Sequence, residues 1–175
     1  TGESIALTTC DLAAGAGSLT TFFESALALV SVAEPRCVVA VSPLDDTDPA
    51  PIFVHTRDGV VVDYGKKALR SPLTFAGARL MNSAFATLLL NSSEEFATDT
   101  EMMTSVVRSF PRHVRSLVVN DLFDVDHPGA LLRAEELTRE GRLSSHPPGA
   151  DGHLRVTARS TAPSATEASH PPPDA

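Results

Sequence analysis

The sequence of 175 residues has no tryptophan, one tyrosine and only two cysteines, Cys10 and Cys37. Two cysteines provide neither a disulfide framework nor the spacing of a metal site, which predicts an intracellular, reducing compartment. The separated histidines His55, His113 and His127 share no ligand spacing either, so no metal site is predicted. Long apolar runs are also missing. Because none is long enough to span a bilayer, we expect no membrane partner.

Basic residues are scarce, since 14 lysines and arginines stand against 22 aspartates and glutamates, a formal net charge of −8. This balance argues against a broad phosphate-binding surface. One local basic cluster remains, with two open interpretations: the solvated start of a helix, or a contact with an RNA backbone. Its members are Lys66, Lys67, Arg70 and Arg79.

The length and the hydrophobic fraction of 42% fit one domain with a sizeable core. Short apolar runs alternate with amphipathic stretches, which predicts strands alternating with helices. The expected strands are residues 4–10, 36–41, 52–55, 60–64, 114–119 and 152–158. The expected helices are residues 18–34, 72–91, 99–110 and 126–140. This order is typical of an α/β domain, here a doubly wound, mainly parallel sheet over residues 1–158. Residues 159–175, rich in proline, serine and alanine, predict a disordered tail.

The first expected strand leads into a stretch of small residues, from Asp11 to Gly17, that opens the first helix. Small residues let a backbone pass close to a ligand, and the free N–H groups of a helix start point into the same gap. The same pattern also joins strands to helices for packing alone. Ligands of parallel sheets bind beyond the carboxyl ends of the strands, so the loops after other strands are candidates for the same rim. These loops are residues 42–48, 57–59 and 120–128.

The segment from Asp11 to Gly17 resembles the first motif of the class I S-adenosylmethionine-dependent methyltransferases, whose fold is Rossmann-like. In that motif an acidic residue is followed by glycines at every second position. Gly15 and Gly17 match, and Ala13 stands in place of the first glycine. The resemblance implies S-adenosylmethionine as the cofactor, with the Gly15–Gly17 backbone against its methionine part and Asp11 at its ammonium group.

Three later positions resemble further parts of the same family. Ser42 ends the second strand, where an acidic residue that holds the ribose hydroxyls is usual. Asp58 lies where an acidic residue often contacts the adenine amino group. Asp121 resembles the catalytic residue that faces the methyl acceptor and orients or deprotonates it. From the residues alone, a second interpretation stays open for Asp11, Asp58 and Asp121, as loop caps or turn residues.

Among subfamilies, the FtsJ-like RNA ribose methyltransferases are most similar, and Asp121 would be the aspartate of their Lys-Asp-Lys-Glu set. The lysines and the glutamate have no counterparts at the expected positions, and Ser42 replaces the usual acid. The resemblance therefore implies an RNA methyltransferase, active or degenerate, that acts as a subunit of an RNA-processing or ribonucleoprotein complex. The implied partners are RNA and the other proteins of that complex.

A second resemblance is to the small roadblock- or longin-like interaction modules, which have no enzymatic activity. It rests on the hairpin expected at residues 52–64, followed by the long helix expected at residues 72–91. Under this alternative, the segment from Asp11 to Gly17 holds no ligand and stays unexplained.

Overall fold

The centre of the structure is strand β3 (Cys37–Pro43), whose first six residues are all buried. The computed structural model describes residues 3–15, 17–92 and 96–143. Three helices flank the central sheet, and they are α1 (Ser18–Val30), α2 (Ser83–Ser92) and α3 (Asp99–Ser109). Side chains alternate between the two faces of a strand. Val39 and Val41 therefore pack with α2 and α3, whereas Val38 and Ala40 pack with α1 on the other face.

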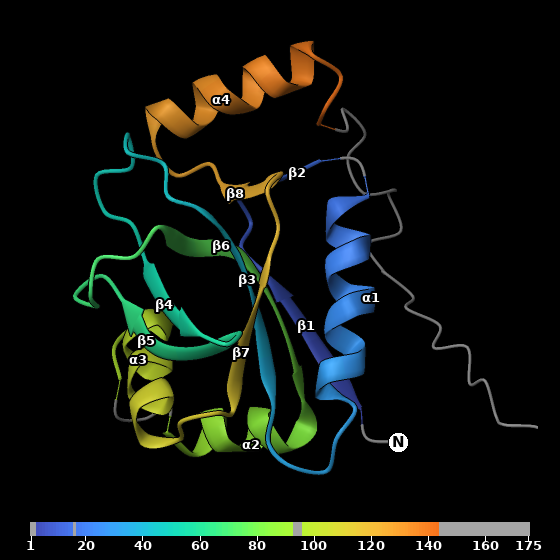
Figure 1. The fold of residues 1–175 in the computed structure, drawn as a ribbon, viewed down its shortest axis with the longest axis vertical. Coiled ribbons are helices and arrows are strands. Elements are labelled where there is room, and N and C mark those ends of the chain that lie inside the picture. The colour runs from blue at the N-terminus through green and yellow to red at the C-terminus, as the bar shows by residue number, and fades with distance from the viewer. Residues whose placement is uncertain (1–2, 16, 93–95, 144–175) are drawn as a thin grey trace, which may run out of the picture.

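Six strands form this sheet. In spatial order they are β1 (Ser4–Thr8), β6 (Leu73–Asn82), β3, β7 (Val114–Val118), β5 (Val60–Gly65) and β4 (Phe53–Arg57) (Figure 1). Strands β3 and β7 run parallel, whereas the other pairings in the described part of this sheet are antiparallel. The predicted α/β class is confirmed. The doubly wound, mainly parallel arrangement is wrong, because β6 lies between β1 and β3 and runs antiparallel to both.

The segment predicted as one helix over residues 72–91 is a ten-residue strand, β6, followed by α2. Ala78 and Leu80 of β6 are buried against α1, and Met81 is buried in the core on the opposite face. A strand buried on both faces is apolar at nearly every position, so a helical spacing can be found in it by chance. Gly77 has a φ of +80°, a left-handed conformation that a helix interior does not contain.

A small second sheet lies at one end of the molecule, beneath α4 in Figure 1. It consists of the antiparallel strands β2 (Leu12–Ala14) and β8 (Leu122–Asp124), and the helix above it is α4 (Pro128–Arg139). The helix covers the sheet through Ala130 and Leu137, which pack with Phe123. The His127 ring nitrogen Nδ1 caps the helix by accepting a hydrogen bond from the Ala130 N–H at 3.3 Å. Strand β8 is therefore held directly below the start of a helix.

Most other predicted elements are present. The helices expected at residues 18–34, 99–110 and 126–140 correspond to α1, α3 and α4. The strands expected at residues 4–10, 36–41, 52–55, 60–64 and 114–119 correspond to β1, β3, β4, β5 and β7. Residues 11–17, expected to form a loop, contain β2. The strand expected at residues 152–158 and the tail at 159–175 lie outside the described residues. Within the described ranges, no helix is long and apolar enough to cross a membrane.

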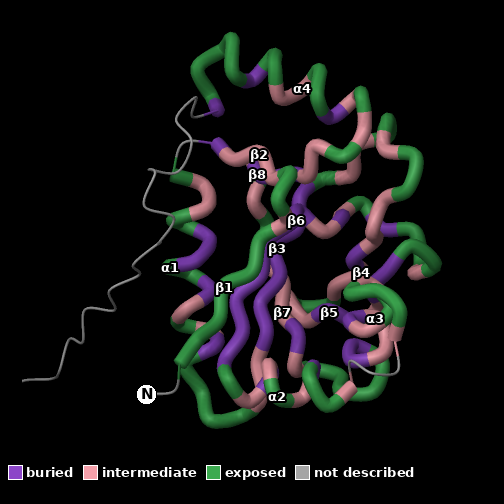
Figure 2. The backbone as a smooth tube through the Cα atoms, turned by 180° about the vertical axis from the view of Figure 1, so that it is seen from behind, coloured by how far each residue is buried: buried purple, intermediate pink, exposed green. Residues whose placement is uncertain are grey.

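Strand β1 lies at the edge of the large sheet and is exposed along its whole length, in contrast to the buried central strands (Figure 2). Its hydrogen-bonded neighbour is β6, with Ser4 opposite Asn82 and Thr8 opposite Ala78. The pairing continues one residue further, because the Thr9 N–H donates to the Gly77 carbonyl at 2.8 Å. Thr9, directly after β1, therefore lies at the end of the molecule where the two sheets meet.

Candidate functional site

Two aspartates meet where the small sheet adjoins the large one. Asp124 is the last residue of β8 and lies opposite Leu12 of β2. The Val125 N–H donates to the Asp11 carbonyl at 2.8 Å. The strand pairing therefore brings the side chains of Asp11 and Asp124 close enough to repel each other, although they are far apart in the sequence.

The position of the Asp124 carboxyl depends on a hydrogen bond from Thr9 and on the space that Gly77 leaves open. The Thr9 hydroxyl donates a hydrogen bond to Asp124 Oδ1. A Cβ atom at position 77 would overlap Asp124 Oδ1 and would lie 2.6 Å from Thr9 Oγ1. Only glycine leaves this space open, and its left-handed φ of +80° also favours glycine there. Gly77 is therefore required for the position of Asp124.

Asp124 carries a strongly perturbed carboxyl group. Burial is the main cause that raises its pKa to about 6. Repulsion from Asp11, Asp126 and Asp48 raises the pKa further, whereas the hydrogen bond from Thr9 acts in the opposite direction. A carboxylate surrounded by like charges gains more than an ordinary one from a proton or a metal cation beside it. The arrangement suits Asp124 to a positively charged ligand.

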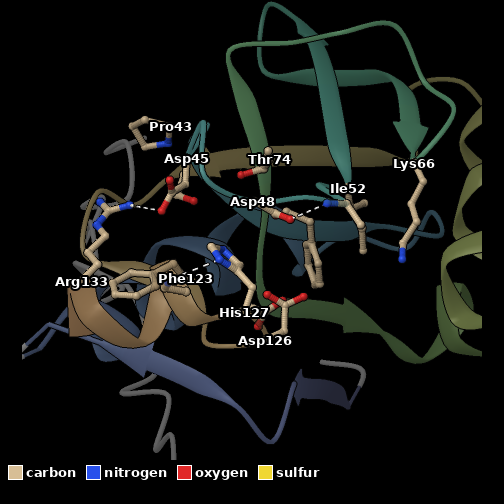
Figure 3. A pocket seen from close by; sticks show the side chains of 15 residues that line it. Pro43, Asp45, Asp48, Ile52, Lys66, Thr74, Phe123, Asp126, His127 and Arg133 are labelled. Carbon is tan, nitrogen blue, oxygen red and sulfur yellow. Dashed lines mark hydrogen bonds and ion pairs between the residues drawn. The ribbon is translucent and has the colours of Figure 1, made fainter. Parts of the chain in front are cut away.

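Asp124 lines a cavity of about 90 Å³ beneath α4, called here the acidic cavity (Figure 3). Its described lining contains four carboxylates, from the loop after β3, from the end of β8 and from the segment between β8 and α4, and they are Asp45, Asp48, Asp124 and Asp126. Two permanently charged basic side chains also line it. Arg133 and Lys66 lie at opposite ends in Figure 3, with Asp48, Asp126 and His127 between them. The formal charge of the lining is negative, with histidine neutral.

One of these carboxylates is already engaged. Asp45 Oδ1 accepts hydrogen bonds from the Thr47 N–H at 2.9 Å and from the Thr47 hydroxyl at 2.7 Å. Arg133 lies 3.9 Å from the other oxygen of Asp45, and its guanidinium also covers the Phe123 ring at 4.7 Å. Partial burial acts to raise the pKa of Asp45, but Thr47, Arg133 and His127 outweigh it and lower the pKa. Asp48 and Asp124 each accept one hydrogen bond, from the Ala50 N–H and the Thr9 hydroxyl, so Asp45 is the most fully engaged of the four carboxylates.

The site residues predicted from the sequence are scattered, and one of them, Ser42, lines the acidic cavity. Asp11 lies beside Asp124, and Ser42, which is buried, lines the cavity itself. Ala13 lies in the middle of β2, opposite Phe123. Asp58 is remote from them at the β4–β5 turn, where its φ of 53° makes it the first of two left-handed turn residues.

The remaining predicted residues gather at the start of α1. Gly15 donates its N–H to the Asp121 carbonyl at 2.6 Å, and a Cβ atom there would lie 2.7 Å from the Asp121 Cβ. Gly17 caps α1 with a φ of 79°. Gly17 and Asp121 line a separate open cavity of about 340 Å³, and Asp121 pairs with Arg142 at 3.0 Å. In this structure, Gly15 allows close packing of two chain segments.

The basic cluster predicted from the sequence is dispersed. Arg79 is buried and pairs with Asp99 at 2.5 Å, so it does not reach solvent with the others. Arg70 lies 3.6 Å from Asp46 on the surface. Lys66 and Lys67 stay exposed in the turn after β5.

Sequence reasoning missed the central residues of the acidic cavity. It stopped at Asp121, although Asp124 and Asp126 follow within the same segment, directly before a helix. A run of carboxylates spaced by two or three residues at the end of a strand was the available signal. Gly77 carried a second signal, because a glycine inside an expected helix lowers the helical propensity and often has a packing reason.

Comparison with known proteins identifies the fold. No family model and no curated protein matches the chain. Among solved structures, the inositol-1-phosphate CTP transferase from T. maritima matches with a TM-score of 0.57 and 17% identity over 79% of this chain. A protein from Bacillus anthracis described as a glucose-1-phosphate thymidylyltransferase, in complex with a sucrose, matches with a TM-score of 0.60 and 13% identity over 79% of this chain. The chain spans 56% of the length of each.

These neighbours overturn the interpretation as a methyltransferase. The class I and FtsJ-like resemblance is wrong, and S-adenosylmethionine as cofactor is wrong with it. The physical reason is that the segment from Asp11 to Gly17 forms β2 and a tight contact with Asp121, not a loop open to a cofactor. The roadblock- or longin-like alternative is not supported either, since residues 73–82 form a strand. RNA and other proteins as partners stay predictions. The fold is that of the nucleotidyltransferases to which the chain is similar.

Proposed function

We propose that the chain forms the carboxylate side of a nucleotidyl-transfer site, which passes a nucleotidyl group from a nucleoside triphosphate to a small phosphate-bearing acceptor. The observation that carries this proposal is the meeting of Asp11 and Asp124 at the paired strands β2 and β8, in a fold similar to nucleotidyltransferases. The neighbours act on CTP and inositol 1-phosphate or on glucose 1-phosphate, according to their names. Because the chain spans 56% of their length, the proposal concerns only the carboxylate side of such a site.

The carboxylates suit a divalent cation such as Mg²⁺. Within the described residues, no group of three or more His, Cys, Asp or Glu side chains is arranged to hold a metal, so a closed protein cage is not present there. Mg²⁺ does not need one, because it is commonly held by one or two carboxylates together with waters and substrate phosphates. Burial and the carboxylates around it raise the pKa of Asp124. A bound cation would stabilise the ionised form of this carboxyl. Asp124 would hold the ion, and the Asp11 carboxylate beside it would add negative charge. The sequence, in contrast, predicted no metal site.

The residues of the cavity have separable roles in this reaction. An oxygen of the acceptor phosphate attacks the α-phosphorus of the triphosphate, and pyrophosphate leaves as the bond to the β-phosphate breaks. The bound cation would neutralise charge on the phosphate oxygens. Thr9 orients the Asp124 carboxyl through its hydrogen bond. Lys66, at the far end of the cavity from Arg133, supplies a positive charge to a phosphate that enters there.

The direct test is a titration of the chain with Mg²⁺, followed by calorimetry or by NMR. Asp124→Asn keeps the size of the side chain and should weaken Mg²⁺ binding by about tenfold or more, since even outer-shell partners of metal ligands are worth that much. Asp46→Asn is the matched control, because Asp46 is on the surface with its side chain 85% exposed. Equal Mg²⁺ affinity in the wild type and in Asp124→Asn would contradict the proposed role of Asp124.

A second experiment addresses the reaction. The chain is incubated with Mg²⁺ and either CTP with inositol 1-phosphate or dTTP with glucose 1-phosphate, and pyrophosphate release is measured. Release that depends on the acceptor and disappears in Asp124→Asn supports nucleotidyl transfer. Acceptor-independent release that persists in Asp124→Asn would assign the chemistry to another site.

A further inference from the structure

A second cavity, of about 830 Å³, lies on the other side of Lys66, between the turn after β5 and helix α3. It is called here the basic cavity. Its walls come from residues 64–68 and 96–109, and Lys66 is also part of the wall of the acidic cavity. The two cavities are therefore neighbours that share one ammonium group.

The charges of the two cavities are opposite. Among the residues that the structure describes, Lys66, Lys67 and Arg108 line the basic cavity, together with one carboxylate, that of Glu101. Asp63 lies 3.2 Å from Arg108, but it also accepts hydrogen bonds from the backbone N–H groups of Tyr64 and Leu69 and does not line the cavity. In a chain with a net charge of −8, such a concentration of cations around one cavity favours an anionic ligand.

Asp99, which adjoins two of the lining residues in the sequence, forms an ion pair. Asp99 lies between Thr98 and Thr100, which both line the basic cavity, and it pairs with Arg79 at 2.5 Å. The Arg79 side chain is only 10% exposed, and its Nε and Nη1 groups have no hydrogen-bond partner. Asp99 and Arg79 therefore largely neutralise each other, and the pair adds little net charge near the cavity.

Hydroxyl groups complete the polar lining. The Thr98 hydroxyl oxygen accepts a hydrogen bond from the Glu101 N–H at 3.2 Å, so its proton is free to be donated. Ser105 also lines the cavity, and its hydroxyl is a further hydrogen-bond donor. Phosphate oxygens accept hydrogen bonds from such donors, and Phe96 offers an apolar surface for an organic group.

We propose that the basic cavity binds a phosphorylated small molecule, of the size of a sugar phosphate or a mononucleotide, at a site distinct from the acidic cavity. Lys67 and Arg108 would pair with the phosphate, and the hydroxyl of Thr98 would donate to it. Lys66 borders both cavities. When its ammonium group pairs with a phosphate in one cavity, it is no longer available to a phosphate in the other. By linkage, the two cavities then weaken each other's affinity for phosphate ligands by the same factor.

The probe is inorganic pyrophosphate, titrated into the chain by calorimetry with EDTA present so that no divalent cation contributes. The double variant Lys67→Gln and Arg108→Gln should lose about tenfold or more in affinity, as expected for the loss of charge-assisted hydrogen bonds. Arg139→Gln is the matched control, since Arg139 is an exposed arginine in the last turn of α4, outside both cavities. Lys67→Glu gives a second variant that reverses the charge of an exposed side chain and leaves the ion pair of Arg108 intact.

The outcomes separate this proposal from the nucleotidyl-transfer proposal. Absence of pyrophosphate binding to the wild type, or equal affinity in the double variant, overturns the basic cavity as an anion site. Asp124→Asn should leave pyrophosphate binding in EDTA unchanged, whereas it should weaken Mg²⁺ binding. Failure of the Mg²⁺ experiment alone therefore leaves the basic cavity standing, and failure of the pyrophosphate experiment alone leaves the proposed function standing.

Discussion

The hydroxyl of Thr9 donates a hydrogen bond to Oδ1 of Asp124, across a sequence separation of 115 residues. This contact joins the end of an exposed edge strand to the end of a short strand beneath α4. The carboxyl that it orients lines the acidic cavity and has a pKa raised by burial to about 6. The surroundings of this carboxyl lead to three testable predictions, and the ion pair between Arg79 and Asp99 leads to a fourth.

Thr9→Val should raise the pKa of Asp124 further above 6, because the variant removes the hydrogen bond that lowers it. The loss of one hydrogen bond to a partly buried acceptor should also reduce the free energy of unfolding by about 1 kcal/mol. An NMR titration of the Asp124 carboxyl carbon measures the first effect, and urea denaturation measures the second. Thr8→Val, at the exposed neighbouring position, is the control. An unchanged Asp124 titration in Thr9→Val would show that the hydrogen bond does not form in solution.

Gly77→Ala should be strongly destabilising, since its Cβ overlaps Asp124 Oδ1 and its φ of +80° is unfavourable for alanine. The backbone strain of alanine at this φ, together with the overlap of its Cβ with Asp124, should lower the free energy of unfolding by roughly 2–4 kcal/mol. Gly141→Ala is the matched control: its φ is +70°, and a Cβ there would have no atom within 4 Å. It should show only the backbone cost, about 1 kcal/mol. Equal losses in chemical denaturation of the two variants would mean that the space beneath Asp124 is not tight.

The raised pKa of Asp124 makes folding stability depend on pH. The folded state binds the proton of this carboxyl more tightly than the unfolded chain, whose reference pKa is 3.8. Its contribution to stability is therefore fully present below pH 3.8 and is lost as the pH rises through about 6. Asp124→Asn removes this loss, so the stability of the variant relative to the wild type should increase between those two pH values and then stay constant. A stability difference for Asp124→Asn that stays flat between these pH values would exclude the raised pKa.

Asp99→Ala should destabilise the protein more than an ordinary surface substitution, although the Asp99 side chain is 49% exposed. It leaves the buried Arg79 guanidinium without a carboxylate, in addition to its two nitrogen groups that already lack partners. We expect a loss of roughly 2–3 kcal/mol, below the range for fully buried pairs because Asp99 is half exposed. Combining Asp99→Ala with Arg79→Met should recover part of the loss, because the unpaired buried charge is then gone. A double-mutant cycle in urea, with Glu101→Ala as the control, checks this, and strictly additive losses would argue against the pair.

Segments whose pattern of apolar and turn residues matches their position in the fold were predictable from the sequence. The helices α1, α3 and α4 each have one apolar face, and Pro128 marks the start of α4. The β4–β5 hairpin follows from Asp58 and Gly59, which both adopt the positive φ that a two-residue hairpin turn needs. Strand β3 is a continuous apolar run, as expected for a strand buried on both faces.

The candidate site was only partly predictable. Asp11 and Ser42 were predicted as site residues for another cofactor, and Asp11 lies beside Asp124 whereas Ser42 lines the acidic cavity. Asp124 was missed, because nothing near it in the sequence shows that Thr9 and Gly77 support it. The small residues at Gly15 and Gly17 suggested a ligand loop, but Gly15 is small because the Asp121 side chain packs against it.

The sequence by itself determined the α/β class, most of the helices and strands, and the excess of negative charge, since these depend on periodicity and composition. Only the tertiary structure decided that residues 73–82 form a central antiparallel strand, because an apolar segment becomes helix or strand according to what covers its two faces. It also decided where the carboxylates gather. Asp124 and Thr9 meet through strand pairings between distant segments, and no short-range pattern encodes such pairings.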